Sequence, residues 1–392
     1  MLQGKLKVGF VGTRGMVASV LIDRMLQEGN FDHIEAYFYS TSAPDTILTN
    51  SKLNVATKQD SIRLLNAYNV SDFMHLDCIV STQGSAYTLN MLAKLRQSGC
   101  MAYYLDASSA LRLQDDTIIV LDPLNLSQIK TAISSGIKNY SVGNCTVSCM
   151  LLAIDGLIKH NLIDWISTMT YQAVSGAGAK YILELLSQTN YANLQIAEQL
   201  QNKDHIDILS IERHLTKALQ DDSLPKQNFK TTIAYNLIPW IDTLTTTGQT
   251  KEEAKAMREA NKILFNYNID TPNSSNNLLK IDGLCTRVGS LRCHSQALTI
   301  KLKTKNISLD EINTIIANGN QWVKLIPNLQ EETLKYLNPV NISGSLDIAV
   351  GRVRKMIFGD EYISLFTVAD QLLWGAAEPL RRMLSILIDE HN

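Results

Sequence analysis

The segment around Cys145 contains the residues whose types and spacing most directly suggest chemistry. It reads Val142-Gly143-Asn144-Cys145-Thr146-Val147-Ser148, which places a thiol at the start of a predicted helix with Asn144 or Thr146 as its N-cap. Unpaired N–H groups and the positive end of the helix dipole lower the pKa of a thiol at such a position. The same N–H groups can stabilise an oxyanion. We therefore predict that Cys145 is a nucleophile.

The other thiols indicate neither a disulfide framework nor a metal centre. The chain has six cysteines without a repeated spacing, which is typical of reduced thiols. Cys145 and Cys149 lack the paired CxxC groups and the histidine spacing of a zinc site. We interpret Cys78, Cys100 and Cys285 as small buried hydrophobes and expect no metal.

A turn near the N-terminus is the candidate cofactor site. It reads Gly12-Thr13-Arg14-Gly15-Met16-Val17 and lies between an apolar strand and a helix. Glycines in such a turn let backbone N–H groups and the helix N-terminus approach a pyrophosphate. The turn is only part of GxGxxG, so a purely structural turn is the alternative. Its position at the opening of an α/β pattern favours dinucleotide binding.

The end of the second predicted strand indicates which dinucleotide binds. NAD-binding proteins commonly carry Asp or Glu there to hold the ribose 2′-hydroxyl. This chain has Tyr39-Ser40-Thr41-Ser42, which offers hydroxyls without a carboxylate, and it has Arg14 in the turn. The combination favours a 2′-phosphate and therefore NADP. The alternative is that these residues only begin a polar loop.

Alternating strands and helices must position these residues in the first part of the chain. Short apolar runs predict strands, and the helical spacing of Met16, Val20 and Met25 predicts a helix after the first strand. The predicted strands are Lys5–Gly12, Ile34–Ser40, Asp77–Thr82, Met101–Ala107 and Thr117–Asp122, with a helix at Tyr87–Ser98. The alternation predicts the α/β class, with a doubly wound (Rossmann-type) nucleotide-binding domain.

Beyond Asn144 the pattern changes to longer helices, which predicts a second, α+β domain. The predicted helices are Cys145–His160, Ala179–Leu200, Ile206–Gln220 and Lys251–Tyr267, followed by a loop at Pro272–Asn277 and an extended stretch at Asp282–Thr304. A last strand at Tyr362–Val368 and a helix at Gln371–Asp389 are placed back against the first domain. The expected NADP-binding domain is therefore 1–143 plus 366–392, and the second domain is 144–365.

Composition limits the classes of function. A chain of 392 residues with 45% hydrophobic content suits about two globular domains. Its 36 Lys+Arg against 38 Asp+Glu provide no basic face for nucleic acid. No apolar run reaches the roughly 18 to 20 residues that span a bilayer, and no signal peptide is indicated. We expect a cytoplasmic protein with a small-molecule substrate.

The motif Gly143-Asn144-Cys145-Thr146 closely resembles the active-site motif of aspartate-semialdehyde dehydrogenases. Further segments resemble that family in its own order over nearly the whole chain, most closely its bacterial branch. These segments are Arg14–Val17, Ser40–Ser42, Tyr171–Ala173, Asn261–Leu264, Arg287–His294 and Gln371–Arg382. Together they are far more specific than any one motif.

The resemblance implies an NADPH-dependent reductive dephosphorylation of L-aspartyl 4-phosphate to L-aspartate 4-semialdehyde through an acyl thioester. This step would serve lysine, methionine, threonine, isoleucine and diaminopimelate biosynthesis, in a homodimer formed through the second, catalytic domain. Cys145 would be the nucleophile, His294 the acid/base and Gln172 the orienting residue. The implied substrate-binding residues are Arg287 and Glu259 for the amino-acid end, Arg112 and Lys262 for the phosphate, and Asn144 beside the nucleophile. The implied NADP contacts are Gly12, Thr13, Arg14, Gly15, Met16, Val17, Thr41, Ser42, Gln83, Ser175, Gly176, Ala177, Gly178, Ala179 and Gln371.

Rival interpretations come from two classes. A reductase for another acyl phosphate, such as N-acetylglutamyl phosphate, has the same architecture, but an acetylated amine does not need the carboxylate of Glu259. A catalytically silent dinucleotide-binding regulatory protein does not need Cys145 and His294 together. Taken singly, His294 could equally be a hydrogen-bonded histidine in a strand, and Arg112, Glu259 and Lys262 would usually be solvated charges on a helix or loop. Agreement with one motif set favours the enzyme.

Two features depart from the simplest expectation. The second glycine turn, Ser175-Gly176-Ala177-Gly178-Ala179, has alanine where many relatives carry a third glycine. In an unbroken strand Arg287 and His294 would also face opposite sides, because seven residues is an odd step. Both can reach one site only if the strand bends, and Gly289-Ser290 is the predicted place.

Overall fold

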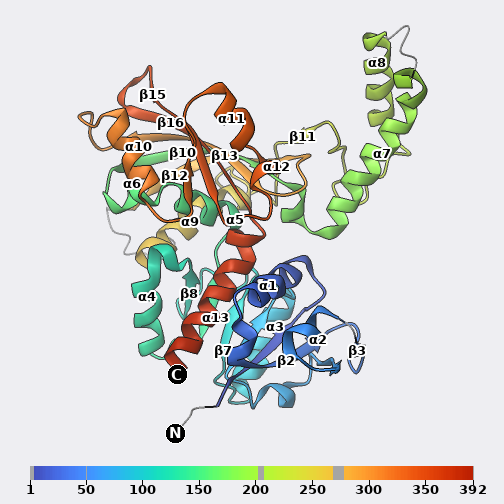
Figure 1. Cartoon of the computed structure of the whole chain (residues 1–392), viewed down its shortest axis with the longest axis vertical. Helices are drawn as coiled ribbons and strands as arrows, with labels where there is room; N and C mark the ends of the chain where they lie inside the picture. Colours follow the sequence, from blue (N-terminus) through green and yellow to red (C-terminus); the bar gives the residue numbers. More distant parts are fainter. Residues whose placement is uncertain (1–3, 50, 202–206, 268–277, 392) are drawn as a thin grey trace.

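The computed structural model describes residues 4–49, 51–201, 207–267 and 278–391. Two lobes form, each around a seven-stranded sheet, and a helical arm projects from the second lobe (Figure 1). The predicted loop at Pro272–Asn277 and the start of the predicted helix at Ile206 lie outside the described residues. Within the described ranges, no helix is long and apolar enough to cross a bilayer.

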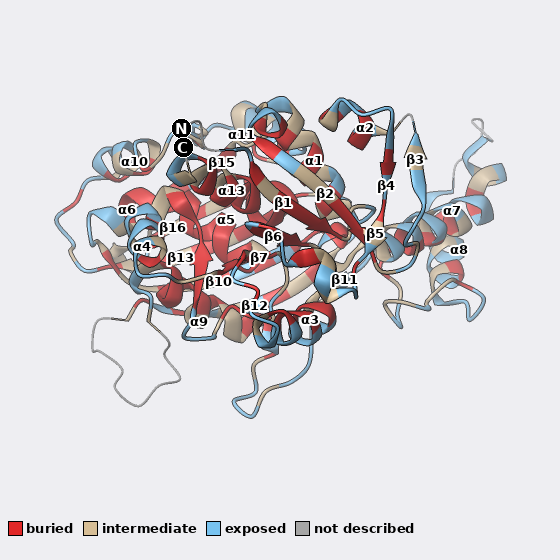
Figure 2. Ribbon diagram, turned by 90° about the horizontal axis from the view of Figure 1, so that it is seen from below, coloured by how far each residue is buried: buried red, intermediate tan, exposed pale blue. Residues whose placement is uncertain are grey.

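The first sheet is parallel throughout. Its strands, in spatial order, are β5 (Leu65–Asn66), β2 (Ile34–Ser40), β1 (Leu6–Val11), β6 (Cys78–Ser81), β7 (Tyr103–Asp106), β9 (Asn139–Val142) and β8 (Thr117–Val120). Successive residues of β6, Ile79 and Val80, belong to separate apolar clusters because a strand points alternate side chains to opposite faces. Helices cover both faces, which explains why these strands are buried in Figure 2.

The helices of the first lobe divide between the two faces. Helices α1 (Met16–Gln27) and α4 (Asp122–Ser134) contribute to one cluster, and α3 (Ser85–Gln97) contributes to the other. A small hairpin of β3 (Ile47–Thr49) and β4 (Ser61–Arg63) carries α2 (Lys52–Thr57) between its strands. This arrangement confirms the predicted doubly wound α/β lobe.

The second sheet is mixed. Its strands, in spatial order, are β11 (Leu237–Ile238), β12 (Lys280–Val288), β10 (Ile163–Gln172), β13 (His294–Leu302), β16 (Gly359–Ala369), β15 (Ile348–Met356) and β14 (Val323–Leu325). The largest core cluster packs one face against α5 (Cys145–Ala153), α6 (Asp155–Lys159), α9 (Lys251–Phe265) and α10 (Leu309–Ala317). On β10 and β12, by contrast, Met169, Tyr171 and Leu284 are exposed, so the sheet has an open apolar surface.

The arm consists of α7 (Ala179–Gln201) and α8 (Ile208–Gln220), which pack against each other and extend from the body (Figure 1). A small cluster around Leu185 and Ile233 anchors its base. Two short helices, α11 (Gln330–Tyr336) and α12 (Pro339–Ile342), precede β15.

Three predicted elements differ from the structure. The predicted helix Cys145–His160 is two helices that meet at Ile154, and the stretch Asp282–Thr304 is two strands, β12 and β13. The strand predicted at Tyr362–Val368 lies in the second sheet, between β13 and β15, and not against the first lobe. Strand periodicity reports burial but not which sheet a strand joins, which explains this error.

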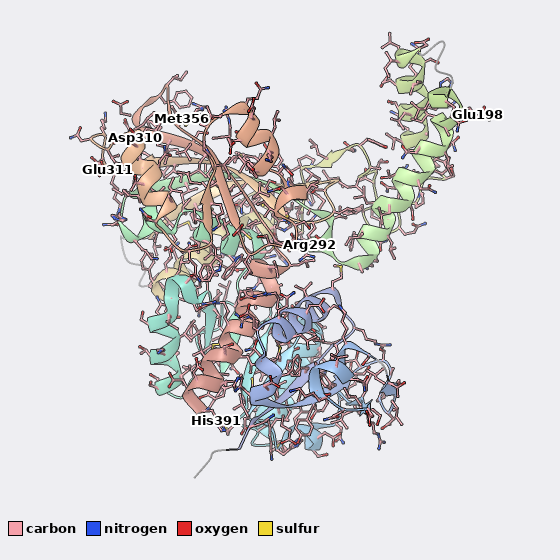
Figure 3. All side chains as sticks on the ribbon, viewed as in Figure 1. Glu198, Arg292, Asp310, Glu311, Met356 and His391 are labelled. Carbon is pink, nitrogen blue, oxygen red and sulfur yellow. The ribbon has the colours of Figure 1, made fainter. Side chains whose placement is uncertain are left out.

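Only the helix of that last segment returns to the first lobe. A single π-helical turn, Leu373–Ala377, leads into α13 (Glu378–His391), whose Leu380, Met383 and Leu387 belong to the first lobe's core. The imidazole of His391, labelled in Figure 3, contacts the carbonyl of Gly4 at 3.0 Å. The first and last described residues, Gly4 and His391, therefore lie on the same lobe.

Candidate active site

Cys145 and His294 meet where the two lobes join. Cys145 is the first residue of α5, directly after β9 of the first sheet, and His294 is the first residue of β13 in the second. The Sγ and Nε2 atoms lie 3.2 Å apart. A thiol and an imidazole within contact distance are the elements of a nucleophile with an acid/base partner.

The order of strands in the second sheet brings Gln172 and Arg287 to the same place. Strand β10 lies between β12 and β13, and Gln172 at its end is in register with Arg287 on β12. The chain crosses from one side of β10 to the other through residues 289–293. The predicted break between Arg287 and His294 therefore occurs at Gly289-Ser290, but as a crossing between strands rather than a bulge.

Gly176 shows how closely these groups approach. A Cβ on Gly176 would lie 3.0 Å from Nη1 of Arg287 and 3.0 Å from Cε1 of His294. The Arg287 guanidinium also donates to the carbonyl of Ala173 at 2.7 Å. The backbone of the second glycine turn is therefore pressed against the catalytic candidates, where a side chain would not fit.

The hydrogen bonds of His294 fix its tautomer. The backbone N–H of Ala173 donates to Nδ1 at 3.0 Å, so Nδ1 is an acceptor and the ring proton lies on Nε2. Burial, with the Arg287 charge nearby, lowers the pKa of His294 to about 3. The imidazole is therefore neutral and directs an N–H at the sulfur of Cys145.

The predicted lowering of the thiol's pKa is wrong for the free site. Burial raises the pKa of Cys145 to about 11, and the negative charge of Glu252 contributes to the rise. The positive charges of Arg112 and Arg287 offset this rise only in part. The helix N–H groups that were expected to favour the thiolate, or an oxyanion, are already engaged. The side-chain oxygen of Asn144 accepts from the N–H groups of Thr146 and Val147 at 2.9 and 3.3 Å.

Arg112 and Glu259, predicted to bind opposite ends of a substrate, contact each other. The guanidinium Nη1 lies 3.0 Å from Oε1 of Glu259, and both residues are buried. The other oxygen of Glu259 accepts from the backbone N–H of Asn144. Lys262 donates to the carbonyl of Gln114 at 2.7 Å, and burial lowers its pKa. Glu259 and Lys262 lie on α9, whereas Arg112 lies in the segment between β7 and β8.

The predicted cofactor turn borders a cavity of about 280 Å³. Its lining residues are Gly12, Thr13, Arg14, Gly15, Tyr39, Ser40, Thr41, Ser42, Thr82 and Gln83. Gly12 has φ +89°, and a Cβ there would lie 2.9 Å from the side-chain oxygens of Thr82 and Gln83. Gly15 precedes α1, which opens with Met16 and Val17, without a side-chain cap, and the Arg14 guanidinium donates to the Ser42 hydroxyl.

The second glycine turn lies outside the lining of that cavity. It forms a short 3-10 turn at Val174–Ala177, passes through Gly178 at φ +112°, and enters α7 at Ala179. Gln371 contacts both this turn and the residue before β13. Its amide nitrogen donates to the Ser175 hydroxyl, and its side-chain oxygen accepts from the N–H of Cys293 at 2.8 Å. The structure thus places the two sets of predicted cofactor residues on different lobes.

Two family models together match most of the chain. One, described as "Semialdehyde dehydrogenase, NAD binding domain", matches residues 7–132, and the other, "Semialdehyde dehydrogenase, dimerisation domain", matches residues 154–374. The structure of aspartate semialdehyde dehydrogenase from Francisella tularensis is 47% identical, covers 97% of this chain and 99% of its own, and superposes with a TM-score of 0.88. The chain belongs to the aspartate-semialdehyde dehydrogenase family. It is therefore an oxidoreductase by family.

More distant members of the aspartate-semialdehyde dehydrogenase family share the fold. Aspartate semialdehyde dehydrogenase II from Vibrio cholerae, solved complexed with ASA, is 22% identical with a TM-score of 0.75, over 98% of this chain and 99% of its own. The enzyme from Candida albicans, solved with NADP, is 16% identical with a TM-score of 0.63, over 98% and 99%.

Two residues of this family member's site were missed from the sequence. Glu252 accepts from the side-chain amides of Asn144 and Gln172, and Gly375 lies so close that a Cβ there would be 2.3 Å from Cβ of Cys145. A glutamate in the first turn of a helix is usually solvated, so its residue type gave no signal. Gly375 lies in a segment with helical spacing, and a lone glycine in such a segment can indicate close packing against a neighbour.

Proposed function

We propose that this chain is an NADPH-dependent aspartate-semialdehyde dehydrogenase that converts L-aspartyl 4-phosphate to L-aspartate 4-semialdehyde and phosphate. The observation that carries the proposal is the 3.2 Å approach of the Cys145 sulfur to Nε2 of His294, in a chain 47% identical to a member of that family. The same site would run in reverse from the semialdehyde, phosphate and NADP. The reaction would serve biosynthesis of lysine, methionine, threonine, isoleucine and diaminopimelate.

The proposed route begins with attack of the Cys145 sulfur on the acyl carbon. The bond from that carbon to the phosphate oxygen breaks, phosphate leaves with the electron pair and the thiol proton, and a thioester remains. NADPH, when bound, would supply the hydride for reduction of this thioester. The Nε2–H of His294 points at the reacting sulfur, where it stabilises the thiolate as the carbon–sulfur bond breaks and the aldehyde is released.

The charged residues around the thiol suit an amino-acid acyl phosphate. We assign the substrate's carboxylate to Arg287, its phosphate to Arg112 and Lys262, and its ammonium to Glu259. Arg112 and Glu259 contact each other in the free site, so an incoming substrate would exchange this ion pair for contacts with its own charges. Gln172, next to Arg287, would orient the acyl group.

The cavity at the first glycine turn fits a dinucleotide. Gly12 lets the backbone pass close to Gln83, and the uncapped N-terminus of α1 offers its N–H groups to a pyrophosphate. We assign the 2′-phosphate to Arg14, Thr41 and Ser42, because this edge of the cavity carries hydroxyls and a guanidinium without a carboxylate. NADP would therefore be preferred over NAD.

We further propose a cytoplasmic homodimer that forms through the second sheet. Residues Met169 and Leu284 are in register on adjacent strands and are both exposed, and the ring of Tyr171 packs beside that of Phe366. An open apolar sheet face of this kind is the surface that a second copy would cover. The match of this lobe to a dimerisation domain supports the assignment.

The test is formation of NADPH from L-aspartate semialdehyde, phosphate and NADP. We expect phosphate-dependent turnover that is lost in Cys145→Ala, while NADP binding survives. N-acetylglutamate semialdehyde should be a poor substrate, because it leaves the Glu259 carboxylate without an ammonium. Faster turnover of the acetylated compound would favour the rival reductase, and binding of NADP without turnover of either aldehyde would favour a silent dinucleotide-binding protein.

A further inference from the structure

Glu252 is a buried carboxylate next to the nucleophile. It lies in the first turn of α9, is 8% exposed, and receives three hydrogen bonds. Its Oε1 accepts from Nδ2 of Asn144 at 3.0 Å and from Nε2 of Gln172 at 3.2 Å, while its Oε2 accepts from Nζ of Lys255 at 2.8 Å. No role in the proposed reaction has been given to this residue.

An ionised carboxylate can only accept hydrogen bonds, so it determines which end of a neighbouring amide faces it. Asn144 must present its NH₂ group to Glu252, and its oxygen therefore faces the N–H groups of Thr146 and Val147, where it caps α5. Gln172 must also present its NH₂ group, and this directs its oxygen away from Glu252. One carboxylate thus sets the orientation of two amides, that of Asn144 directly before Cys145 and that of Gln172.

We propose that Glu252 is the positioning residue of this site: it fixes the amide orientations of Asn144 and Gln172 and places a constant negative charge beside the thiol. Through Asn144 it holds the start of α5, and so the Cys145 backbone, in place. Through Gln172 it selects which polar atom meets the acyl group. The second part rests on the proposed function, whereas the first concerns the thiol alone.

The ionisation of Glu252 is compatible with this role. Burial opposes it, but the charge and hydrogen bond of Lys255 and the amides of Asn144 and Gln172 outweigh burial and lower the pKa of Glu252 to about 2. The carboxylate is therefore charged at any physiological pH. Other charged or titratable groups that act on the Cys145 thiol include Arg112, Lys255 and Arg287, the buried thiols of Cys149 and Cys285, and the neutral His294 in contact with it.

The neighbouring Glu253 provides a matched control. It is 7% exposed, lies on the same helix, and accepts from the N–H groups of Thr250 at 2.6 Å and Cys285 at 3.2 Å. Its contacts are those of a helix cap and a strand, and it touches neither Asn144 nor Gln172 in the described hydrogen bonds. Glu253→Gln therefore makes the same chemical change at equal burial without touching the two amides.

The experiment compares Glu252→Gln, Glu252→Asp and Glu253→Gln with the native enzyme. The first readout is the rate of Cys145 alkylation by iodoacetamide against pH, which needs no substrate. Removing a negative charge beside the thiol should move this profile to lower pH by about one unit in Glu252→Gln. Glu252→Asp and Glu253→Gln both keep a negative charge at position 252, so the pH profile of Cys145 alkylation in each should match that of the native enzyme.

The second readout is the steady-state split between kcat and KM. A glutamine can donate as well as accept, so it no longer dictates the two amide orientations, and kcat should fall about 10- to 100-fold with KM for phosphate nearly unchanged. Glu252→Asp, one methylene shorter, should also lower kcat while its alkylation profile stays native. Glu253→Gln should keep its kcat within a factor of a few.

Each outcome decides the matter. An unshifted alkylation profile in Glu252→Gln, or an equal shift in Glu253→Gln, overturns the proposal, as does full kcat in Glu252→Asp. If Glu252→Gln does not fold, the aspartate variant alone decides through its kcat. A shifted profile in an enzyme whose native form does not turn over aspartate semialdehyde would sustain the role of Glu252 at the thiol and reject the proposed function.

Discussion

At the residue scale, the free site holds a thiol and a neutral imidazole rather than an ion pair. Nδ1 of His294 is occupied by the N–H of Ala173, so the ring cannot take a second proton without losing that bond. Burial meanwhile raises the pKa of Cys145 to about 11. The nucleophile is therefore protected from adventitious chemistry until a ligand changes the charges around it.

This state predicts the pH dependence of thiol reactivity. Because the thiolate is the reactive form and the thiol's pKa is raised, alkylation of Cys145 in ligand-free enzyme should keep rising roughly tenfold per pH unit beyond pH 9. Stopped-time alkylation followed by mass spectrometry of the Cys145 peptide checks this. A plateau near pH 7 would mean that the thiolate is already formed, as the sequence alone had suggested.

His294→Ala should lower kcat by roughly 10²- to 10³-fold, the usual scale when one hydrogen-bond donor to charge that develops in the transition state is removed. Because the pKa of His294 is lowered to about 3, the native ring stays neutral above that pH. The shape of the native pH profile between pH 5 and 8 should therefore persist in the variant. A variant that loses affinity but keeps its maximal rate would make His294 a binding residue only.

At the element scale, the π-helical turn Leu373–Ala377 packs directly against the nucleophile Cys145. Gly375→Ala would place a methyl group 2.3 Å from Cβ of Cys145, against backbone that has little room to move. We expect a loss of about 1 to 3 kcal/mol in the free energy of unfolding and a larger relative loss of kcat. Gly4→Ala, where a Cβ meets nothing within 4 Å, is the control. Chemical denaturation of both variants tests the contact, and equal stability would contradict it.

Local patterns were sufficient to predict several elements. Apolar spacing predicts the first strand, the glycine turn and the helix that follows. The presence of Asn144 before Cys145 predicts the start of α5. The break near Gly289 was read from the odd step to His294. These features depend on residues close together in the chain.

What the sequence did not predict depends on contacts between distant segments. Burial overrides the helix N-terminus at Cys145, and the cap of Asn144 uses the N–H groups that would otherwise have favoured a thiolate. Two of the three hydrogen bonds to Glu252 join α9 to the N-cap of α5 and to β10, and no periodicity encodes such a meeting. For the same reason β16 was placed with the wrong sheet.

At the scale of the whole molecule, α13 joins the end of the chain to the first lobe through buried charges. Glu378, 1% exposed, accepts from Arg381 at 2.7 Å and from Arg24 of α1 at 3.0 Å. Burial opposes the ionisation of Glu378, but these hydrogen bonds outweigh it and lower its pKa. Its contribution to stability is therefore present above the pKa of a free carboxyl and is lost as the pH falls.

Glu378→Gln should destabilise the fold by roughly 3 to 5 kcal/mol at neutral pH, since it leaves the buried Arg381 guanidinium without its counter-charge and removes one of the two carboxylates paired with Arg24. The difference in Tm from the native chain should shrink on acidification, as the native carboxylate is protonated. Glu28→Gln removes the exposed partner of Arg24, with a side chain 43% exposed, and should cost less than about 1 kcal/mol. Equal losses in the two variants would contradict the assignment.

The open face of the second sheet predicts how the molecule assembles. Met169→Lys places a charge on the exposed apolar surface and should weaken the proposed homodimer, because a buried unpaired charge is costly at an interface. Leu126→Lys, on α4 of the first lobe and similarly exposed at 41% against 39%, should leave assembly unchanged. Sedimentation velocity over a range of concentrations distinguishes them. A native monomer, or dissociation by both variants, would be the contrary result.

The chain passes between the lobes twice, and both passages meet at one residue. The first runs from Val142 into Cys145. The second runs from Ala369 through Asp370, which forms an ion pair with Arg292, to the turn that touches Cys145; Arg292 is labelled in Figure 3. Side-chain contacts also bridge the lobes, from Arg112 to Glu259 and from Asn125 and Gln128 to the carbonyls of Ile263 and Leu264. The sulfur of Cys145 therefore lies where two covalent connections and a set of buried contacts hold the lobes together, and its position relative to both lobes is constrained at several points.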